Sequence, residues 1–534
     1  MRNQETREQG NKGTRGPGSA TTASCPVVAL ALWRKGGKVP PLACGRSFRL
    51  VAFLLAAVAS ANSLPAQQSK PWEQIPIPKL HEFHPQQPKR IQLSNGIVVF
   101  LQEDHELPFI SGSVLIPGGS RDEEPAKAGL AGLYGQAWRT SGTAKMDGDA
   151  MDDFLEARAA HIETAGDDDS TALSWDSLKG DADPIFSLAM DLLFHPKFSP
   201  DKLQLAQQQE ATSIVRRNDN EDEIADRESN KLVYGADSPY ARQPELATIG
   251  AVTLDDLQAW HDRTLKGPLI VGIFGDFDPA AMEAKVRAAF ESLPAVTPAP
   301  ARHDSFPGPA PGVYFIDKQD VNQSNVQIVD IGVDRRNPDT PAIAVLNEIL
   351  GGGFGSRLFQ KIRTQLGLAY AVGGGFGLTY DHPGTFRVEV LTKSATTVDA
   401  TNTAREEIAG LNTKPFTEEE LKRAKDDILS SFLFRYDTAE KVLSERERIE
   451  FYGYPPGYLE TYQAGLEKVT LADVATAARK YIHPDKLAIL VVGNGPEIKQ
   501  SQSLDALGLG PAKPIDIAIP MPARPQGAAA GAER

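Results

Sequence analysis

The sequence predicts an α/β protein, an α+β sandwich made of two homologous domains, each a mixed sheet covered by helices. Two observations support this fold class. Strand and helix patterns alternate through both halves of the chain, and the second half repeats an order of elements found in the first. With 534 residues, 41% of them hydrophobic, the chain is long enough for two or three domains with sizeable cores.

The internal repeat is clearest where each half ends. Val252-Thr-Leu-Asp-Asp-Leu257 and Val469-Thr-Leu-Ala-Asp-Val474 begin 217 residues apart. Each is followed by a helical pattern and then by an apolar strand pattern, at 268–276 and 487–493. The same helix-then-strand order in both places indicates a duplication, and therefore two domains of the same fold.

Apolar patterns in the first half predict its strands and helices. Strand patterns cover 91–102, around Asn95-Gly96, and 109–116. A helix is predicted from Leu130 to Arg139 because its apolar residues fall on one stripe; these are Leu130, Leu133, Tyr134, Ala137 and Trp138. A long helix is predicted over 200–217, and Thr253 and Thr470 are predicted N-caps of the two repeated helices.

Shifts in composition predict the domain boundaries. Proline-rich and alanine-rich stretches separate segments with regular apolar patterns. The predicted division is a signal or targeting segment at 1–66, a linker arm at 67–89, a first domain at 90–293, a linker at 294–311, a second domain at 312–510 and a disordered tail at 511–534.

The leader has the features of a secretory signal. Arg46-Ser-Phe-Arg49 precedes the apolar run Leu50–Ala59, and Ala59-Ser-Ala61 fits a cleavage site. The run is too short to span a bilayer comfortably, so no stable membrane span is expected. The signal lies far from Met1, which favours a downstream start with 1–45 not translated. The expected location is periplasmic or secreted.

Charge and cysteine content exclude several classes of partner and of chemistry. The formal net charge is −14, which argues against nucleic acid or an anionic membrane surface as the main partner. The only cysteines, Cys25 and Cys44, precede the apolar run of the signal. The mature chain is therefore expected to contain no disulfide, no thiolate nucleophile and no thiolate metal ligand.

The stretch GGGFGSRLFQKIRTQLGLAY, at 351–370, contains the candidate functional residues. A glycine-rich turn leads into a predicted amphipathic helix, with Leu358, Phe359, Ile362 and Leu366 as its apolar positions, and then into a strand. Arg363 and Tyr370 lie seven residues apart. Guanidinium and phenol groups are donors suited to a polarised carbonyl or an oxyanion. The alternative is a capped surface helix whose arginines, Arg357 and Arg363, are solvated.

Ser356-Arg-Leu-Phe, followed by Arg363 and Gly367-Leu-Ala-Tyr370 after a glycine-rich turn, resembles the C-terminal signature of the pitrilysin/insulinase family of zinc metallopeptidases. Mitochondrial processing peptidase and its two-subunit bacterial relatives belong to that family. The similarity extends from about Leu93 to Gly493. It implies two domains that face each other like a clam shell, with Arg363 and Tyr370 completing an active site. It also implies a flexible loop that could contact peptide, formed by Gly351, Gly352, Gly353 and Gly355.

The zinc motif of that family is missing. Members carry His-x-x-Glu-His on a helix after Gly-Leu-Ala, where two imidazoles hold zinc and the glutamate is a general base. Here Gly129-Leu-Ala131 is present, but Gly132, Gly135 and Gln136 occupy the three positions. Glycine has no side chain and a glutamine amide has no useful basicity. No metal site is therefore predicted in this chain.

Other candidate ligands do not form an evident set. Glu210 lies near the region of the family's third ligand, but the alignment of that helix does not assign it a role. The remaining candidates are scattered and are predicted to be surface or second-layer residues (His105, His161 and His195) or to lie in the proline-rich arm (His81 and His84). Two glycines inside a helix cost about 1 kcal/mol each relative to alanine. Close packing by another backbone and drift at an abandoned site are both left open.

The resemblance implies that this chain is the non-zinc subunit of an exported heterodimeric zinc metallopeptidase. The partner would be a homologous subunit that carries the zinc, and the substrate would be a peptide or an unfolded protein segment. The chain is then expected to be inactive alone. A catalytically inactive structural or peptide-binding protein of the same family is the second hypothesis. A self-sufficient peptidase with another metal set is the third, and a homodimer is also compatible with the sequence.

Overall fold

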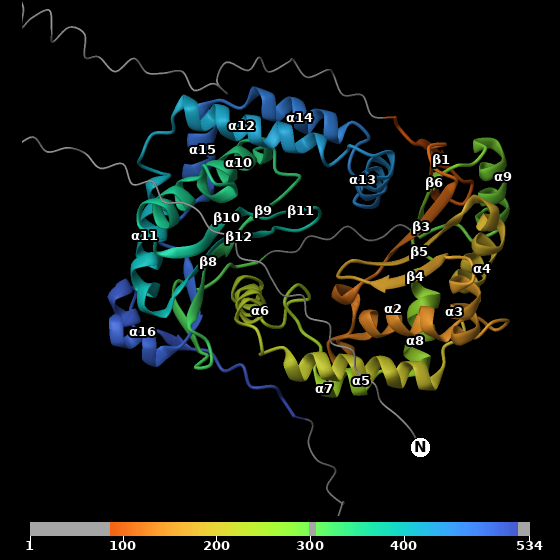
Figure 1. The fold of residues 1–534 in the computed structure, drawn as a ribbon, viewed down its shortest axis with the longest axis horizontal. Coiled ribbons are helices and arrows are strands. Elements are labelled where there is room, and N and C mark those ends of the chain that lie inside the picture. Colours follow the sequence, from red (N-terminus) through yellow and green to blue (C-terminus); the bar gives the residue numbers. More distant parts are fainter. Residues whose placement is uncertain (1–85, 298–305, 522–534) are drawn as a thin grey trace, which may run out of the picture. The chain divides into compact units, whose positions relative to one another are not determined.

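The computed structural model describes residues 86–297 and 306–521 (Figure 1). Strands in these residues form two six-stranded sheets and one two-stranded pair, as the predicted fold class requires. The predicted signal at 1–66, His81 and His84 lie outside the described residues, as does most of the arm at 67–89.

Sheet 1 is built from strands of the first half in the order β1-β2-β6-β3-β5-β4. Only β2 and β6 are parallel, and every other neighbouring pair is antiparallel. The strands are β1 (Lys89–Gln92), β2 (Val98–Glu103), β3 (Phe109–Pro117), β4 (His161–Gly166), β5 (Ser170–Leu178) and β6 (Ile270–Gly275).

Sheet 2 has the order β10-β12-β8-β13-β7-β14 and repeats the topology of sheet 1 in five of its strands. Its inner strands, β7 and β13, are parallel like β2 and β6, and β13, β8, β12 and β10 then follow antiparallel. The sixth strand differs, since β14 pairs parallel with β7 whereas β1 pairs antiparallel with β2. The strands are β7 (Gly312–Asp317), β8 (Gln323–Ile331), β10 (Ala369–Phe376), β12 (Thr385–Lys393), β13 (Ala488–Gly493) and β14 (Lys513–Pro514); β9 (Val333–Asp334) and β11 (Leu378–Thr379) form the separate pair.

Both halves contribute helices that cover the two sheets. The first half has α2 (Leu130–Ser141), α3 (Gly148–Glu156), α4 (Ala182–Phe194), α5 (Pro200–Arg216), α6 (Glu221–Tyr234), α7 (Leu246–Gly250), α8 (Leu254–Thr264) and α9 (Pro279–Phe290). The second half has α10 (Thr340–Asn347), α11 (Thr397–Gly410), α12 (Glu418–Leu433), α13 (Ala439–Phe451), α14 (Tyr458–Lys468), α15 (Leu471–Tyr481) and α16 (Gly495–Ser501). No helix of the described residues is long and apolar enough to cross a membrane.

The duplication extends to the helix caps. Thr253 and Thr470 both begin their helices with a capping box, in which the threonine hydroxyl accepts from the third backbone N–H. The aspartates at those third positions, Asp256 and Asp473, accept in return from the threonine N–H groups, at 2.8 and 2.9 Å. The predicted N-caps are confirmed.

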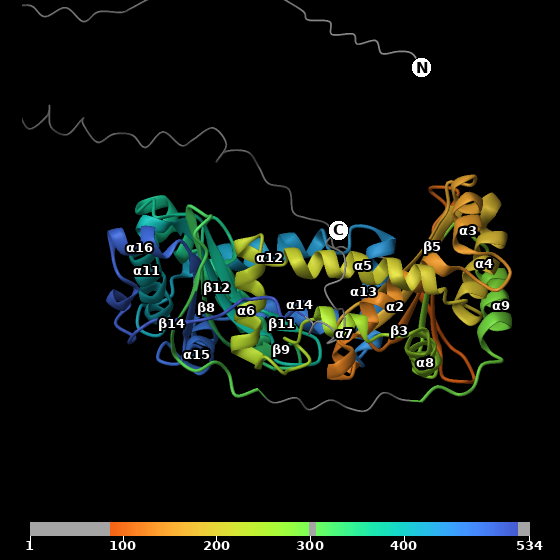
Figure 2. The same cartoon turned by 90° about the horizontal axis from the view of Figure 1, so that it is seen from below.

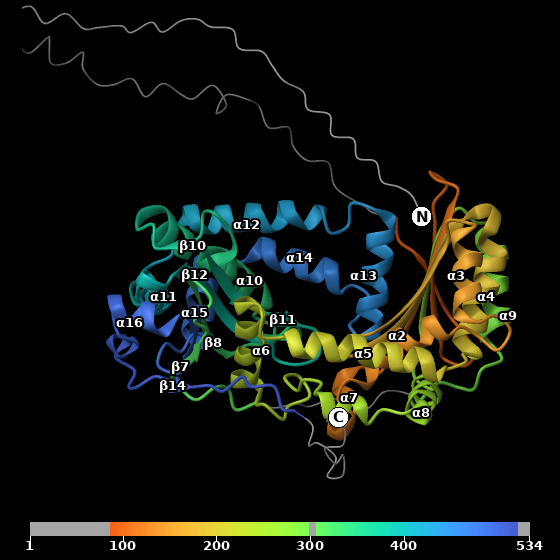
Figure 3. The same ribbon diagram turned by 60° about the horizontal axis from the view of Figure 1, so that its bottom comes forward.

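The two halves exchange one helix. α6 of the first half packs on β8 and β13 of sheet 2, opposite α11 (Figure 2). α13 of the second half packs on β2, β3 and β6 of sheet 1, opposite α4 and α9 (Figure 3). Ile224 and Ala225 of α6 join an apolar cluster with Leu490, and Leu443 of α13 joins one with Phe100. The second face of each sheet is therefore buried by the other half.

The prediction of a disordered tail from residue 511 is wrong for 511–521. Lys513 and Pro514 form β14, which extends sheet 2 beside β7. Ile515 N donates to Phe315 O at 2.9 Å, and Ile517 O accepts from Asn218 Nδ2 at 2.7 Å. The proline- and alanine-rich composition of this segment hid Ile515 and Ile517, two isoleucines at alternate positions that are partly buried against the protein. Residues 522–534 lie outside the described residues.

Glu447 of α13 is buried against sheet 1. Its Oε1 accepts a hydrogen bond from Ser113 Oγ of β3 at 2.8 Å. Gly272 of β6 leaves the room for this carboxyl, because a Cβ there would collide with it. Burial raises the pKa of Glu447 to about 7, since the charged form would lose its hydration.

We predict that Glu447→Gln stabilises the protein at pH 8 and has little effect at pH 5. The unfolded chain ionises near the ordinary glutamate pKa, whereas the folded chain keeps the proton until about pH 7. Stability is therefore lost as pH rises through this window, and glutamine removes that loss. We expect a gain of about 1 kcal/mol or more at pH 8, measured by urea unfolding.

Glu440→Gln, on an exposed position of the same helix, is the matched control. It should change stability by at most about 0.5 kcal/mol at either pH. An equal effect of Glu447→Gln at pH 5 and pH 8 would contradict the assignment.

Candidate functional site

Helix α2, which carries the positions of the missing motif, is anchored through its apolar stripe. All five predicted stripe residues are buried. Tyr134 Oη lies 2.8 Å from Nδ1 of His261 on α8, and Trp138 Nε1 donates to Leu192 O of α4 at 2.9 Å. Burial lowers the pKa of His261 to about 4, which keeps this imidazole neutral at neutral pH.

The N-terminus of α2 is fixed by Glu123. Its carboxylate accepts from the backbone N–H groups of Gly129 and Ala131, at 2.9 and 2.6 Å. Burial raises the pKa of Glu123, and these two backbone hydrogen bonds act in the opposite direction. Arg242 donates to the carbonyls of Glu123 and Ser120, at 2.9 and 3.2 Å. The start of the helix is thus held in one orientation.

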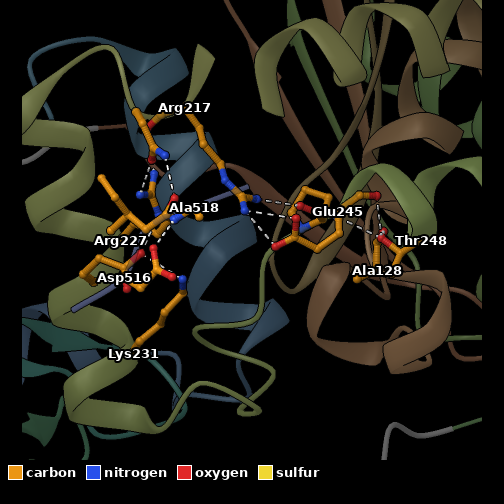
Figure 4. Close-up of polar contacts among 12 residues, drawn as sticks. Ala128, Arg217, Arg227, Lys231, Glu245, Thr248, Asp516 and Ala518 are labelled. Carbon is orange, nitrogen blue, oxygen red and sulfur yellow. Dashed lines mark hydrogen bonds and ion pairs between the residues drawn. The ribbon is translucent and has the colours of Figure 1, made fainter. Parts of the chain in front are cut away.

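The loop before α2 is tied to the neighbouring helices (Figure 4). Thr248 Oγ1 of α7 donates to Ala128 O at 2.7 Å. Arg217, at the end of α5, makes a two-point contact with the Glu245 carboxylate at 2.8 and 3.0 Å. These contacts join α5, α7 and the start of α2.

The three degenerate motif positions differ in their surroundings. Gly132 and Gln136 are exposed on one face of α2, one turn apart, whereas Gly135 is buried. A Cβ at residue 132 would meet nothing within 4 Å. A Cβ at residue 135 would lie 2.5 Å from Gly166 N and 2.9 Å from Ala165 C, both in β4. The backbone of β4 fills the space in which a glutamate side chain would begin.

Hydrogen bonds hold β4 against α2. Thr164 Oγ1 donates to Gly135 O at 2.6 Å and accepts from Arg139 N at 3.1 Å. Arg139 Nε donates to Ile162 O at 2.6 Å. Of the two explanations for the helix glycines, close packing by another backbone therefore applies to Gly135, and no neighbour explains Gly132.

The side chains present do not fit zinc. In 86–297 and 306–521 no group of three or more His, Cys, Asp or Glu residues is arranged to hold a metal ion. His105 pairs with Asp276 and Glu103, His161 with Asp176 and His195 with Asp191, all as exposed histidines. Their predicted surface placement is confirmed. Glu210 is half-buried on α5, and burial raises its pKa.

The segment after the glycine turn differs from the predicted amphipathic α-helix. α10 continues into a π-helix, η5 (Glu348–Gly352), and a second π-helix, η6, spans Phe359–Gln365. Leu358 and Ile362 are fully buried as predicted, but Leu366 is 46% exposed. Wider π turns move every fourth residue progressively around the helix, so Leu366 leaves the buried stripe.

The glycines of the turn allow close packing inside the second half. A Cβ on Gly351 would lie 2.5 Å from Gly374 O of β10. Cβ atoms on Gly352 and Gly353 would press on the Glu348 carboxylate, and one on Gly355 would press on Arg423. Backbone packing accounts for Gly351, whereas Gly352, Gly353 and Gly355 face the ends of flexible side chains, and the predicted contact of this loop with peptide stays a prediction.

The two arginines of the segment have different surroundings. Arg357 makes a two-point ion pair with Glu420, at 2.7 and 2.9 Å, and donates to Pro415 O. Its role is structural. Arg363 is exposed and contacts only ring faces among the described residues, with its guanidinium carbon 4.9 Å from the Phe359 ring centre and 5.4 Å from that of Tyr370.

The structure therefore brings Arg363 and Tyr370 together at the start of β10. Tyr370 is 74% exposed, and its hydroxyl has no hydrogen-bond partner among the described residues. Phe354, 77% exposed in the glycine turn, continues the row by contacting Phe359 edge to face at 5.0 Å. Such a row of exposed rings and a guanidinium can contact a peptide through both apolar faces and donors.

Two residues that shape the site were not singled out from the sequence. Glu123 precedes Gly129 by six residues, a spacing that matches no capping box. Gly166 ends a strand pattern and faces Gly135 across the contact of α2 with β4. A glycine at a strand end is the signal for such an approach, but it does not identify the partner.

The comparisons with known proteins agree on one family. Residues 98–233 match the model described as Insulinase (Peptidase family M16), and residues 251–428 match Peptidase M16 inactive domain. Together the matches span more than half of the chain. "Non-peptidase homolog YmxG" of Helicobacter pylori (strain ATCC 700392 / 26695) is 23% identical over 413 residues, 74% of this chain and 92% of that protein. "Uncharacterized zinc protease YmxG" of Bacillus subtilis (strain 168) is 22% identical, covering 76% and 98%.

Solved structures share the fold. The peptidase M16 inactive domain from Pseudomonas fluorescens is similar with a TM-score of 0.68 and 25% identity, over 76% of this chain and 98% of that one. A protease from Helicobacter pylori is similar with a TM-score of 0.66 and 18% identity, over 77% and 100% of the two chains.

We predict opposite effects of adding one methyl group at the two helix glycines. Gly135→Ala should destabilise the protein by about 1–3 kcal/mol, because its Cβ would collide with the β4 backbone. Gly132→Ala should stabilise it by about 0.5 kcal/mol or more, because alanine favours the helix and the space is open. Thermal and urea unfolding of both variants provide the measurement.

Gly166→Ala approaches the same contact from the strand, where its Cβ would meet Ala131 O, and should resemble Gly135→Ala. If Gly135→Ala were as stable as Gly132→Ala, the two glycines would reflect drift alone.

Proposed function

The chain belongs to peptidase family M16, and from this membership we propose that it is the non-zinc subunit of an exported heterodimeric zinc metallopeptidase. The chain itself is an inactive M16-family protein, since Gly132, Gly135 and Gln136 occupy the positions of the family's zinc ligands and general base. The partner in this proposal is a homologous subunit that carries the zinc, and the substrate is a peptide or an unfolded protein segment.

The observation that carries the proposal is the exposed pair Arg363 and Tyr370. Both keep their donors unused within the described residues, while the neighbouring Arg357 pairs with Glu420 through Nε and Nη2. In the composite site, the Tyr370 hydroxyl donates to the oxyanion that develops as the scissile carbonyl is attacked. Arg363 binds a substrate backbone carbonyl and orients the peptide.

A peptide can also be held by its backbone. β10 is an edge strand of sheet 2, and Tyr370 is its second residue. An extended peptide that added to such an edge would run past Tyr370, and the Gly351 backbone lies against Gly374 of the same strand. Strand addition gives affinity without side-chain specificity, which suits a peptidase that acts on unfolded segments.

A purely binding or structural role is the second candidate. The packing of β4 onto Gly135 favours it, because a closed motif region contributes nothing to hydrolysis. The name "Non-peptidase homolog" of the Helicobacter pylori relative is compatible with it. A companion chain with an intact His-x-x-Glu-His that co-purifies with this protein would decide for the heterodimer.

We predict that Tyr370→Phe in the reconstituted pair lowers kcat by about 10²-fold with little change in KM, the scale of one lost oxyanion donor. Arg363→Ala should instead mainly raise KM, because it removes a contact made before and during the reaction. Cleavage of a fluorogenic peptide by each chain alone and by the pair gives both constants.

Tyr314→Phe is the matched control, since Tyr314 donates its hydroxyl to Ala310 O and lies on β7, away from β10 in the strand order. It should leave kcat unchanged. Equal kcat for Tyr370→Phe and the native pair would remove Tyr370 from the mechanism.

Export is part of the same proposal and is supported by the apolar run Leu50–Ala59 and the site Ala59-Ser-Ala61. Expressed in a bacterial host, the chain should be recovered from the periplasm or medium with a new N-terminus between residues 61 and 67. Blocking export by Leu54→Arg should retain the longer chain inside the cell. An uncleaved chain found only in the cytoplasm would refute export.

A further inference from the structure

A cavity of about 260 Å³ lies inside the second half. Its walls come from α10, α12 and α14, which pack on one another (Figure 3), from the π-helix η5, and from the strands β10 and β11. The volume is just below the range of about 300–1,000 Å³ that holds drug-sized ligands. The cavity therefore suits a group of the size of one amino-acid residue. Arg363 and Tyr370 do not line it.

Two phenol hydroxyls in the cavity wall are unpaired and yet open to a ligand. Tyr436, which follows α12, is 8% exposed, and Tyr462 of α14 is half-buried. Neither hydroxyl has a hydrogen-bond partner among the described residues. Neither belongs to the unpartnered atoms that are sealed from solvent, so a ligand can reach both. A donor in such surroundings costs free energy unless a group in the cavity accepts its hydrogen bond.

Two guanidinium groups in the same wall have no carboxylate partner in the described part of the chain. Arg335, half-buried after β9, donates through Nε to Leu378 O at 2.8 Å and through Nη1 to Tyr380 Oη at 3.0 Å. Its Nη2 has no partner there and is not sealed from solvent. Arg435, exposed beside Tyr436, makes no side-chain hydrogen bond or ion pair with the described residues.

The two hydroxyls and the two guanidinium groups lie close together. Burial raises the pKa of Tyr436 and the pKa of Tyr462, and the charges of Arg335 and Arg435 oppose both rises. A charge shifts a pKa in this way only when it is near the titrating group, since the interaction weakens with distance and is screened by water. Hydrogen-bond donors from three segments of the chain therefore face the same part of the cavity.

Two carboxylates near these donors act against an anion. Glu348 of η5 lines the cavity, but burial raises its pKa, which favours its neutral form. Glu445 of α13 raises the pKa of Tyr436, but it does not line the cavity. Its carboxylate accepts from Tyr380 Oη at 3.3 Å and lies 3.7 Å from Arg448. The two unpaired guanidinium charges therefore outweigh the one carboxylate in the wall.

We propose that this cavity binds an organic carboxylate, held by Arg335, Arg435 and the two phenol hydroxyls. Its apolar part lies against the rest of the lining, which is aromatic and aliphatic and includes Phe376, Ile428, Phe432 and Leu459. The acid is either the C-terminal residue of a peptide or a small free acid with an apolar group. The site lies within the second half and needs no partner subunit, so it goes beyond the proposed peptidase role.

Isothermal titration calorimetry on the purified full chain near neutral pH tests the site. Three probes share a phenyl ring and differ in charge: 3-phenylpropionate, 3-phenylpropanamide and phenethylamine. Acetate and inorganic phosphate are anions without the ring. We expect 3-phenylpropionate to bind about tenfold more tightly than its amide, the scale of hydrogen bonds to a charged group. It should also bind more tightly than acetate or phosphate, because its ring is buried on binding.

A tetrapeptide, Ala-Ala-Ala-Phe, identifies the source of the carboxylate. It is compared with a free and with an amidated C-terminus. Binding that needs the free C-terminus identifies the C-terminal residue of a peptide as the ligand. If 3-phenylpropionate binds and neither peptide does, the ligand is a small free acid.

Variants of the wall identify the groups. Tyr436→Phe, which keeps the ring, and Arg435→Gln, at an exposed position, should each lower the affinity for 3-phenylpropionate by about three- to tenfold and leave that for the amide unchanged. Glu348→Gln should raise it, because a like charge leaves the wall. Arg479→Gln, an exposed arginine of α15 that does not line the cavity, is the charge-matched control and should have no effect.

Equal affinity for 3-phenylpropionate and its amide would overturn the site, as would tighter binding of phenethylamine or phosphate. A preference for the acid that survives both Tyr436→Phe and Arg435→Gln would also overturn it. None of these measurements involves turnover or a partner subunit. The cavity and the proposed peptidase role therefore stand or fail separately.

Discussion

The exchange of α6 and α13 is the contact on which the rest of the structure depends. Each sheet buries one face under its own helices and leaves the other face, with apolar residues such as Ile270 in sheet 1 and Val492 in sheet 2, without a helix from its own half. α6 and α13 supply that cover reciprocally. Since a sheet face of this kind stays out of water only when the other half is folded, the two domains must fold and persist together.

The exchange also brings polar groups between the halves. Asp226 of α6 accepts from Gln327 of β8 and Arg387 of β12, at 2.8 and 2.6 Å. On the other sheet, Arg90 makes a two-point pair with Glu450 of α13 at 2.7 and 2.9 Å. These contacts fix the register of each exchanged helix, while apolar burial supplies most of the stability.

Much of the fold follows from residue pattern, because apolar period and capping act locally. The stripe of α2, the N-caps Thr253 and Thr470, and the helix-then-strand order that ends each half were all readable in the sequence. Contacts between distant segments were not readable. The sequence contains Gly135 and Gly166, but only the folded chain shows that the two backbones touch.

The sequence identified the residues of the candidate site but not the contacts that surround them. The motif identified Arg363 and Tyr370, but the sequence did not show that Arg357, the arginine six residues earlier, is paired within the fold. What separates the two arginines is the position of Glu420 on α12, a tertiary contact.

The two parts of the degenerate site, the motif positions on α2 and the pair Arg363 and Tyr370 at β10, differ in how much of each is open to solvent. At α2, a strand backbone packs where a catalytic carboxylate would begin, so the space that chemistry would need is occupied by ordinary core contacts. At β10, a guanidinium and a phenol stay exposed with unused donors among the described residues. The two parts therefore differ in their surroundings: packing closes the Gly135 position of α2, whereas Arg363 and Tyr370 stay open to solvent.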